Sequence, residues 1–134
     1  AGWREAMDDA GLPKREPLVG SWEARWGYVA GQNLVEDGLP DAVMCANDEV
    51  AVGLLRAFAE ARVSVPGDVS VAGFDDVPMA AYAGPGLTTV RQDFADLGRC
   101  ALEAVSHALE GESVDTYVRP TRLVVRGSTG ACAR

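Results

Sequence analysis

Residues 69–76, with the sequence Val-Ser-Val-Ala-Gly-Phe-Asp-Asp, constrain the fold more than any other stretch of the chain. A run of apolar and small residues is typical of a strand that is covered on both faces of a sheet. Two adjacent carboxylates, Asp75 and Asp76, follow directly at its carboxyl end. Ligands bind at the carboxyl ends of strands in open parallel α/β sheets. The stretch therefore predicts both a fold class and the position of a site.

The rest of the chain alternates between predicted helices and predicted strands. Hydrophobic spacing and capping residues predict helices over 2–10, 23–36, 49–62 and 93–110. Short apolar runs predict strands over 18–22, 42–46, 69–74, 87–91 and 117–126, the last one edge-like at Pro120. This alternation, with short connections, indicates an α/β fold with a parallel sheet and helices on both faces.

Composition excludes several functions for a chain of 134 residues. The net charge of −8 disfavours direct binding of nucleic acid, because phosphate contacts require clustered lysine and arginine. Lys14 is the single lysine, so a P-loop and lysine-based catalysis are excluded unless Lys14, in a predicted loop, supplies the amine. His107 is the single histidine, which excludes a histidine metal cluster and leaves only one position for a catalytic triad.

The cysteines and the ends of the chain indicate its cellular setting. Cys45, Cys100 and Cys132 are widely separated, which favours free thiols and a cytoplasmic location. No apolar run approaches the ~18 residues that span a membrane. The first residues lack the pattern of a signal peptide and begin within a predicted helix, so we expect a fragment of a longer protein. No cofactor or metal is expected.

Four polar or aromatic residues follow the ends of predicted strands. They are Trp22, Asn47, Asp75 and Gln92. If the strands are parallel neighbours, these side chains converge on one edge of the sheet. Asn and Gln each offer a donor and an acceptor, Asp accepts hydrogen bonds, and an indole offers a flat apolar face. The set fits a neutral polyol such as a sugar.

These residues and their neighbours Asp48 and Asp76 also have interpretations other than sugar binding. Asn47 and Asp48 fit helix caps, and Trp22 fits a core position. Asp75 and Asp76 fit a turn, a general acid/base pair or ligands of Mg²⁺. Adjacent residues of an extended chain point apart, however, which disfavours a pair that shares one proton. Only the joint placement of the four residues favours a binding site.

Other candidates receive structural interpretations. Cys45 lies within an apolar strand and is expected in the core. His107 shares a predicted helix face with acidic residues and is expected in solvent. Arg119, Arg122 and Arg126 alternate with apolar residues, so we expect the exposed side of a strand rather than a phosphate site.

Four segments together resemble the LacI/GalR family of bacterial transcription regulators. They are Cys-Ala-Asn-Asp-Glu-Val-Ala-Val-Gly (45–53), Val-Pro-Gly-Asp-Val-Ser-Val-Ala-Gly-Phe-Asp-Asp (65–76), Pro-Gly-Leu-Thr-Thr-Val-Arg-Gln-Asp (85–93) and Pro-Thr-Arg-Leu-Val-Val-Arg-Gly-Ser-Thr (120–129). The resemblance implies a two-lobed, periplasmic-binding-protein-like effector domain of type I behind a helix-turn-helix headpiece. The chain resembles the C-terminal half of that domain.

The resemblance also implies a division of the chain. Residues 1–92 correspond to the C-terminal lobe of the effector-binding domain. Residues 93–116 correspond to a crossover helix segment that in the family packs on the N-terminal lobe, and residues 117–134 to a return strand and tail. Operator DNA would be bound only through the headpiece.

Individual positions follow from the same resemblance. Asn47, Asp75 and Gln92 match effector-binding positions of the family, and Trp22 matches a position that is often aromatic. The family's dimer contact corresponds to the helix after Asn47 and to a later loop. Val52, Leu55 and Tyr82 are the interface candidates there.

Three functions are compared. The first is the effector-sensing part of a dimeric, cytoplasmic LacI-type regulator, whose effector is a sugar or small polar metabolite. The alternative is a periplasmic sugar-binding protein of a transport system, which shares the lobes. The third is an enzyme using Asp75 and Asp76, such as a receiver-like phosphoacceptor or a Mg²⁺ hydrolase. A receiver would need its acidic pair near the first strand and a lysine late in the chain, and the chain has no late lysine. We expect no catalytic residues and no enzymatic activity.

Overall fold

A four-stranded sheet lies at the centre of the part of the chain that the structure describes. The computed structural model describes residues 2–114, 116 and 118–131. The strands follow the order β1 (Ala42–Met44), β2 (Ser70–Asp75), β3 (Thr88–Arg91) and β4 (Arg122–Val124). The first three are parallel, whereas β4 is antiparallel to β3. The predicted parallel α/β sheet is therefore confirmed, with one antiparallel strand added where the chain returns to it.

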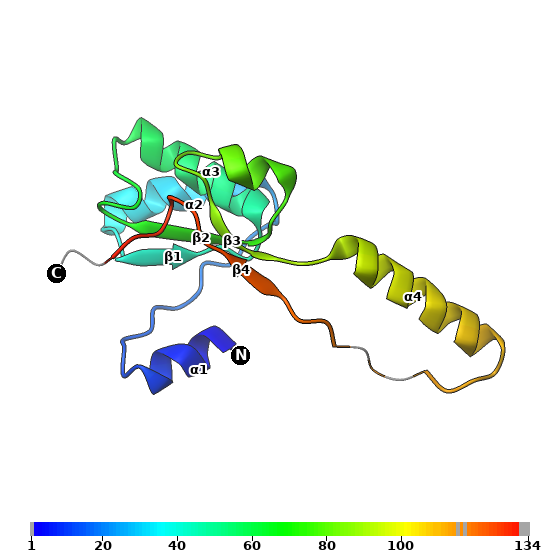
Figure 1. Cartoon of the computed structure of the whole chain (residues 1–134). Coiled ribbons are helices and arrows are strands. Elements are labelled where there is room, and N and C mark those ends of the chain that lie inside the picture. The colour runs from blue at the N-terminus through cyan, green and yellow to red at the C-terminus, as the bar shows by residue number, and fades with distance from the viewer. Residues whose placement is uncertain (1, 115, 117, 132–134) are drawn as a thin grey trace.

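The helices lie within two residues of their predicted bounds. They are α1 (Gly2–Asp9), α2 (Ala24–Asp37), α3 (Asp48–Glu60) and α4 (Phe94–Leu109), with a 3₁₀ helix η1 (Pro78–Tyr82). Helices α2 and α3 lie together on one side of the sheet, and α1 lies on the other side (Figure 1). Helix α4 extends away from the sheet beyond β3 (Figure 1). In the part of the chain described here, no helix is long and apolar enough to cross a bilayer.

The core lies between α3 and β2. Leu54 and Phe58 of α3 are buried against Val71 of β2 and Leu87, which precedes β3. Ser70, Ala72 and Phe74 face the other side of β2 and are only half-buried. The prediction that this strand is fully covered on both faces is therefore wrong for the described residues, because α1 does not reach the sheet (Figure 1).

Two glycines allow α2 and α3 to cross at very short range. A Cβ atom on Gly27 would lie 1.9 Å from the Val50 carbonyl oxygen, and one on Gly53 would lie 1.8 Å from the Ala24 carbonyl oxygen. Both distances are far below van der Waals contact, so only glycine fits at either position. This crossing fixes α3, whose N-cap Asn47 and first residue Asp48 lie at the carboxyl edge of the sheet.

Two predicted strands differ in the structure. Residues 18–22 form no strand, and the side chains of Leu18 and Val19 are exposed. Gly20 instead packs so closely on the Trp26 indole that a Cβ would lie 2.1 Å from the ring. The strand predicted over 117–126 shortens to β4, because Pro120 lacks a backbone N–H for the ladder. Tyr117 lies outside the described residues.

Candidate functional site

Asp75 and Gln92 meet at the carboxyl edge of the sheet. Asp75 ends β2 and Gln92 follows β3, and the two strands pair in parallel up to Asp75 and Arg91. The Gln92 Nε2 donates a hydrogen bond of 2.7 Å to Asp75 Oδ1. Both residues are half-buried, and no residue in the described part of the chain bonds the second carboxylate oxygen of Asp75. The pair therefore presents a carboxylate oxygen and an amide oxygen as acceptors for a ligand.

Asn47 caps α3 and also contacts the segment around Trp22. Its Oδ1 accepts a hydrogen bond of 2.8 Å from the Val50 N–H, and its Nδ2 donates one of 3.0 Å to the Trp22 carbonyl oxygen. The helix-cap interpretation is thus correct for Asn47. One amide N–H of the side chain remains for a ligand, because an amide nitrogen carries two donors.

Trp22 lies near this edge through its backbone rather than through its ring. Its carbonyl accepts the Asn47 hydrogen bond, while the side chain is 67% exposed. The core interpretation of Trp22 is therefore wrong. The structure joins Trp22 to Asn47 and Asp75 to Gln92, and it shows no direct bond between the two pairs among the described residues.

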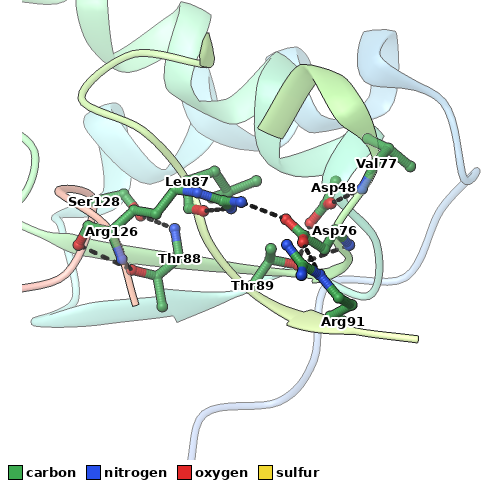
Figure 2. A network of polar contacts seen from close by, with 9 residues as sticks. All are labelled: Asp48, Asp76, Val77, Leu87, Thr88, Thr89, Arg91, Arg126 and Ser128. Atoms are coloured by element: carbon green, nitrogen blue, oxygen red, sulfur yellow. Dashed lines mark hydrogen bonds and ion pairs between the residues drawn. The ribbon is translucent and has the colours of Figure 1, made fainter. Parts of the chain in front are cut away.

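Asp48 has a larger structural role than the helix cap predicted for it. It is the first residue of α3 and is completely buried. Its Oδ2 accepts a hydrogen bond of 2.9 Å from the Val77 N–H, and its Oδ1 accepts one of 2.6 Å from the Thr89 hydroxyl (Figure 2). The helix N-terminus stabilises a negative charge at this position. Sequence reasoning missed this contact because it joins residues 29 and 41 positions apart.

Gly73 makes room for the Asp48 carboxylate. A Cβ on Gly73 would lie 2.2 Å from Asp48 Oδ1. The glycine in the middle of an apolar strand was the one signal in the sequence for a close approach from a neighbouring element.

Asp76 is bound by two arginines. Its Oδ1 accepts from Arg126 Nη2 at 2.6 Å, and its Oδ2 accepts from Arg91 Nε at 2.5 Å (Figure 2). Its side chain is 3% exposed. Burial alone would raise the pKa of Asp76, but the hydrogen bonds and charges of Arg126 and Arg91 outweigh burial and hold that pKa below its ordinary value.

Arg126 corrects one expectation from the sequence. It was expected on an exposed strand side, yet its side chain is only 19% exposed and also donates 2.6 Å to the Leu87 carbonyl oxygen. Arg119 and Arg122 are exposed as expected. The pattern of alternation failed at Arg126 because that residue lies beyond the end of β4, where strand alternation no longer applies.

Ser128 anchors the segment that follows β4. Its hydroxyl accepts 2.8 Å from the Thr88 N–H and donates 2.6 Å to the Val71 carbonyl oxygen. Thr88 Oγ1 and Thr129 Oγ1 share a further bond of 2.8 Å. The closing Gly-Ser-Thr of the chain thereby joins β2 and β3 at their amino-terminal halves.

The geometry does not support the interpretations of Asp75 and Asp76 as an acid/base pair or as ligands of Mg²⁺. Their carboxylates point to different partners, Gln92 and the arginines, so they form no acid/base pair. No group of three or more His, Cys, Asp or Glu residues with metal-binding geometry occurs in the described part of the chain. Burial, followed by the nearby Asp48 charge, raises the pKa of the buried Cys45 thiol to about 12, so it is not a nucleophile at neutral pH.

The three interface candidates differ in exposure. Tyr82 is 86% exposed, Val52 is half-buried and Leu55 belongs to the core. Only Tyr82 offers a largely free side chain in the single chain. A dimer role for the three residues remains a prediction.

Residues 1–129 match the family model of the periplasmic binding protein-like domain. The ribose operon repressor of Escherichia coli K12 is 37% identical over 111 residues, which are 81% of this chain and 34% of the repressor. A crystal structure of the Lac repressor dimer bound to operator and the anti-inducer ONPF superposes with a TM-score of 0.90 at 31% identity, over 97% of this chain and 46% of that one. A LacI-family regulator from Enterococcus faecium with bound ribose superposes with a TM-score of 0.87 at 30% identity, over 96% of this chain and 49% of that one.

The chain belongs to the LacI family of transcriptional regulators. The resemblance inferred from the four sequence segments is therefore confirmed, as is the periplasmic-binding-protein-like fold of a partial effector domain. This LacI-family chain spans about a third of the length of the ribose operon repressor named above and about half of the two solved structures.

Proposed function

We propose that this chain is the effector-sensing part of a DNA-binding transcriptional regulator, and that its effector is a sugar or another small polar metabolite. The bond between Asp75 and Gln92 carries the proposal. It places two acceptors at the carboxyl edge of a parallel sheet, where ligands of such folds bind. Two relatives point the same way, since one is a ribose operon repressor and another holds ribose.

The chemistry of the edge suits a neutral ligand with hydroxyl groups. Asp75 and Gln92 supply acceptors, and the spare N–H of Asn47 supplies a donor. Trp22, whose backbone carbonyl bonds Asn47, has an exposed indole that could supply an aromatic face. Each sugar hydroxyl both donates and accepts, so it can satisfy such a mixed set.

The second wall of the site would come from outside these residues. The four candidate residues are half-buried or exposed on an open edge. In the division proposed above, residues 1–92 form one lobe, 93–116 cross to the other lobe and 117–134 return. The exposed apolar residues of α4, among them Phe94 and Leu102, would then pack on that other lobe.

DNA binding and dimer formation belong to the whole regulator in this proposal. The net charge of −8 makes this segment a poor ligand for phosphate, so operator contacts are assigned to a helix-turn-helix headpiece. A dimer would carry two headpieces, and effector binding would change their spacing and hence DNA affinity by linkage. Such a regulator acts in the cytoplasm and has no catalytic step.

A thermal-shift screen of the intact protein tests this function. The screen compares neutral sugars, including D-ribose, with nucleobases and with inorganic phosphate. A ligand that binds only the native state raises its unfolding temperature. A concentration-dependent shift with a neutral sugar or nucleobase is expected. A shift with phosphate alone would contradict the assignment of a neutral polyol site.

A further inference from the structure

The two residues that end β2 hold an uncommon backbone conformation. Asp75 has φ of 109° and Asp76 has φ of 55°, both in the region that favours glycine. Such conformations persist only where surrounding contacts hold them, and they cluster at functional sites. The contacts that hold this loop are therefore part of what orients the Asp75 carboxylate.

One side chain makes the strongest of these contacts. The buried Asp76 carboxylate binds Arg91 at 2.5 Å and Arg126 at 2.6 Å (Figure 2). Arg91 ends β3 and directly precedes Gln92, and Arg126 follows β4. The Asp76 carboxylate thus ties the loop that carries Asp75 to both strands through which the chain leaves for α4 and returns from it.

A second buried carboxylate holds the other side of the loop. Asp48 accepts from the Val77 N–H and from the Thr89 hydroxyl. The same hydroxyl accepts from the Asp76 N–H at 3.4 Å. The backbone on both sides of the Asp76 side chain is therefore fixed to α3 and β3, which leaves the Asp75 side chain directed at Gln92.

We propose that Asp76, held by Arg91 and Arg126, is a positioning residue for effector recognition. It fixes the orientation in which Asp75 and Gln92 present their oxygens, and it couples that orientation to the β3 and β4 crossing strands. The inference rests on the proposed function, in which Asp75 and Gln92 contact the effector. It assigns to Asp76 no contact with the effector itself.

The test measures loop order and ligand affinity separately in the intact protein. Amide hydrogen exchange at residues 75–77 is followed without ligand, and the dissociation constant for D-ribose is measured by calorimetry. The variants are Asp76→Asn, Arg126→Met and the double variant. Asp96→Asn is the matched control, because Asp96 also binds two arginines, Arg99 and Arg119, but on α4.

Asp76→Asn is expected to speed exchange at residues 75–77 and to raise the D-ribose dissociation constant at least tenfold. Arg126→Met should act in the same direction, and the double variant should be little worse than either single one, since both remove the shared ion pair between Asp76 and Arg126. Asp96→Asn should leave both readouts within twofold of wild type. Val69→Ala, a core change directly before the first residue of β2, controls for loss of stability and should leave affinity unchanged.

Unchanged exchange at residues 75–77 in Asp76→Asn would overturn the proposal whether or not D-ribose binds. Faster exchange with wild-type affinity would overturn it as well. Failure of the proposed function looks different: no neutral sugar or nucleobase in the thermal-shift screen would stabilise the wild-type protein, and Asp75→Ala would change nothing in that screen.

Discussion

Helices α3 and α4 carry the same apolar spacing but have opposite surroundings. Seven residues of α3 are buried, whereas Cys100 is the only buried residue of α4. Phe94, Leu102 and Leu109 of α4 are between 54% and 83% exposed. Hydrophobic periodicity thus predicts that a helix has an apolar face, but it does not say which segment covers that face.

The same difference in burial distinguishes two carboxylates that each bind two arginines. Asp76 lies at the edge of the packed sheet with a side chain 3% exposed, and Asp96 lies on α4 with a side chain 29% exposed. Breaking a desolvated ion pair is costly, whereas exposed pairs contribute little. The contribution of such an ion pair to stability therefore depends on its burial.

The largest expected effect is loss of the buried phenyl ring of α3. Phe58→Ala should lower the free energy of unfolding by about 3–5 kcal/mol, since it leaves a cavity in the core. Leu102→Ala on α4 is the matched control and should change it by less than about 0.5 kcal/mol in residues 1–134. Urea unfolding measures both.

Repeating the Leu102→Ala measurement in the intact protein sharpens this comparison. If a further segment covers α4 there, the cost should rise to roughly 2 kcal/mol or more. An equally small effect in both settings would contradict the proposed packing of α4 on another lobe.

Replacing a glycine by alanine is expected to change stability in opposite directions in α3 and α4. Gly53→Ala places a methyl group 1.8 Å from a carbonyl oxygen of α2 and should cost about 3 kcal/mol. Gly98→Ala on α4 meets nothing within 4 Å and should stabilise the helix by about 0.5–1 kcal/mol. Similar unfolding midpoints for the two variants would contradict the close approach of α2 and α3 seen in the structure.

Substitutions of Asp76 and Asp96 are expected to differ less than the pairs above in their effect on the free energy of unfolding. Asp76→Asn should lower the free energy of unfolding by roughly 2–3 kcal/mol, because it removes the partner of a largely buried guanidinium. Asp96→Asn should cost less than about 1 kcal/mol. Equal losses of unfolding free energy in the two variants would contradict the conclusion that burial strengthens the ion pairs of Asp76.

The smallest expected effect is on the pH dependence of stability, and it is specific to the Asp76 carboxyl group. The pKa of Asp76 is lowered in the folded state, so its contribution to stability is present above the unfolded pKa of about 3.9. That contribution is lost as the pH falls through the lower, folded pKa. The Asp76→Asn variant should therefore lose less stability on acidification than wild type, and parallel curves would contradict the role given to its ion pairs.

Much of this architecture was predictable from the sequence. The helix bounds followed from periodicity and caps, and the carboxyl-end rule brought Asp75 and Gln92 to one edge, where they bond at 2.7 Å. Their role as effector contacts remains a prediction. Local pattern was sufficient here because each residue directly follows its own strand.

The contacts that local pattern missed are long-range. Asp76 meets Arg126 across 50 positions, and Asp48 meets Thr89 across 41. No helix or strand period encodes such pairs. The strand predicted over residues 18–22 was wrong for a related reason, since a short apolar run forms a strand only where a neighbouring strand pairs with it.

The most direct test of the central claim is operator binding by the intact regulator with and without its effector, in wild type and in Asp75→Ala. A fluorescence titration of operator DNA reports the change in affinity that the effector identified by thermal shift produces. Asp75→Ala is expected to keep the unfolding temperature and the effector-free DNA affinity, while its effector response weakens at least tenfold, equivalent to about 1.4 kcal/mol or more of lost binding. A wild-type effector response in Asp75→Ala would contradict it.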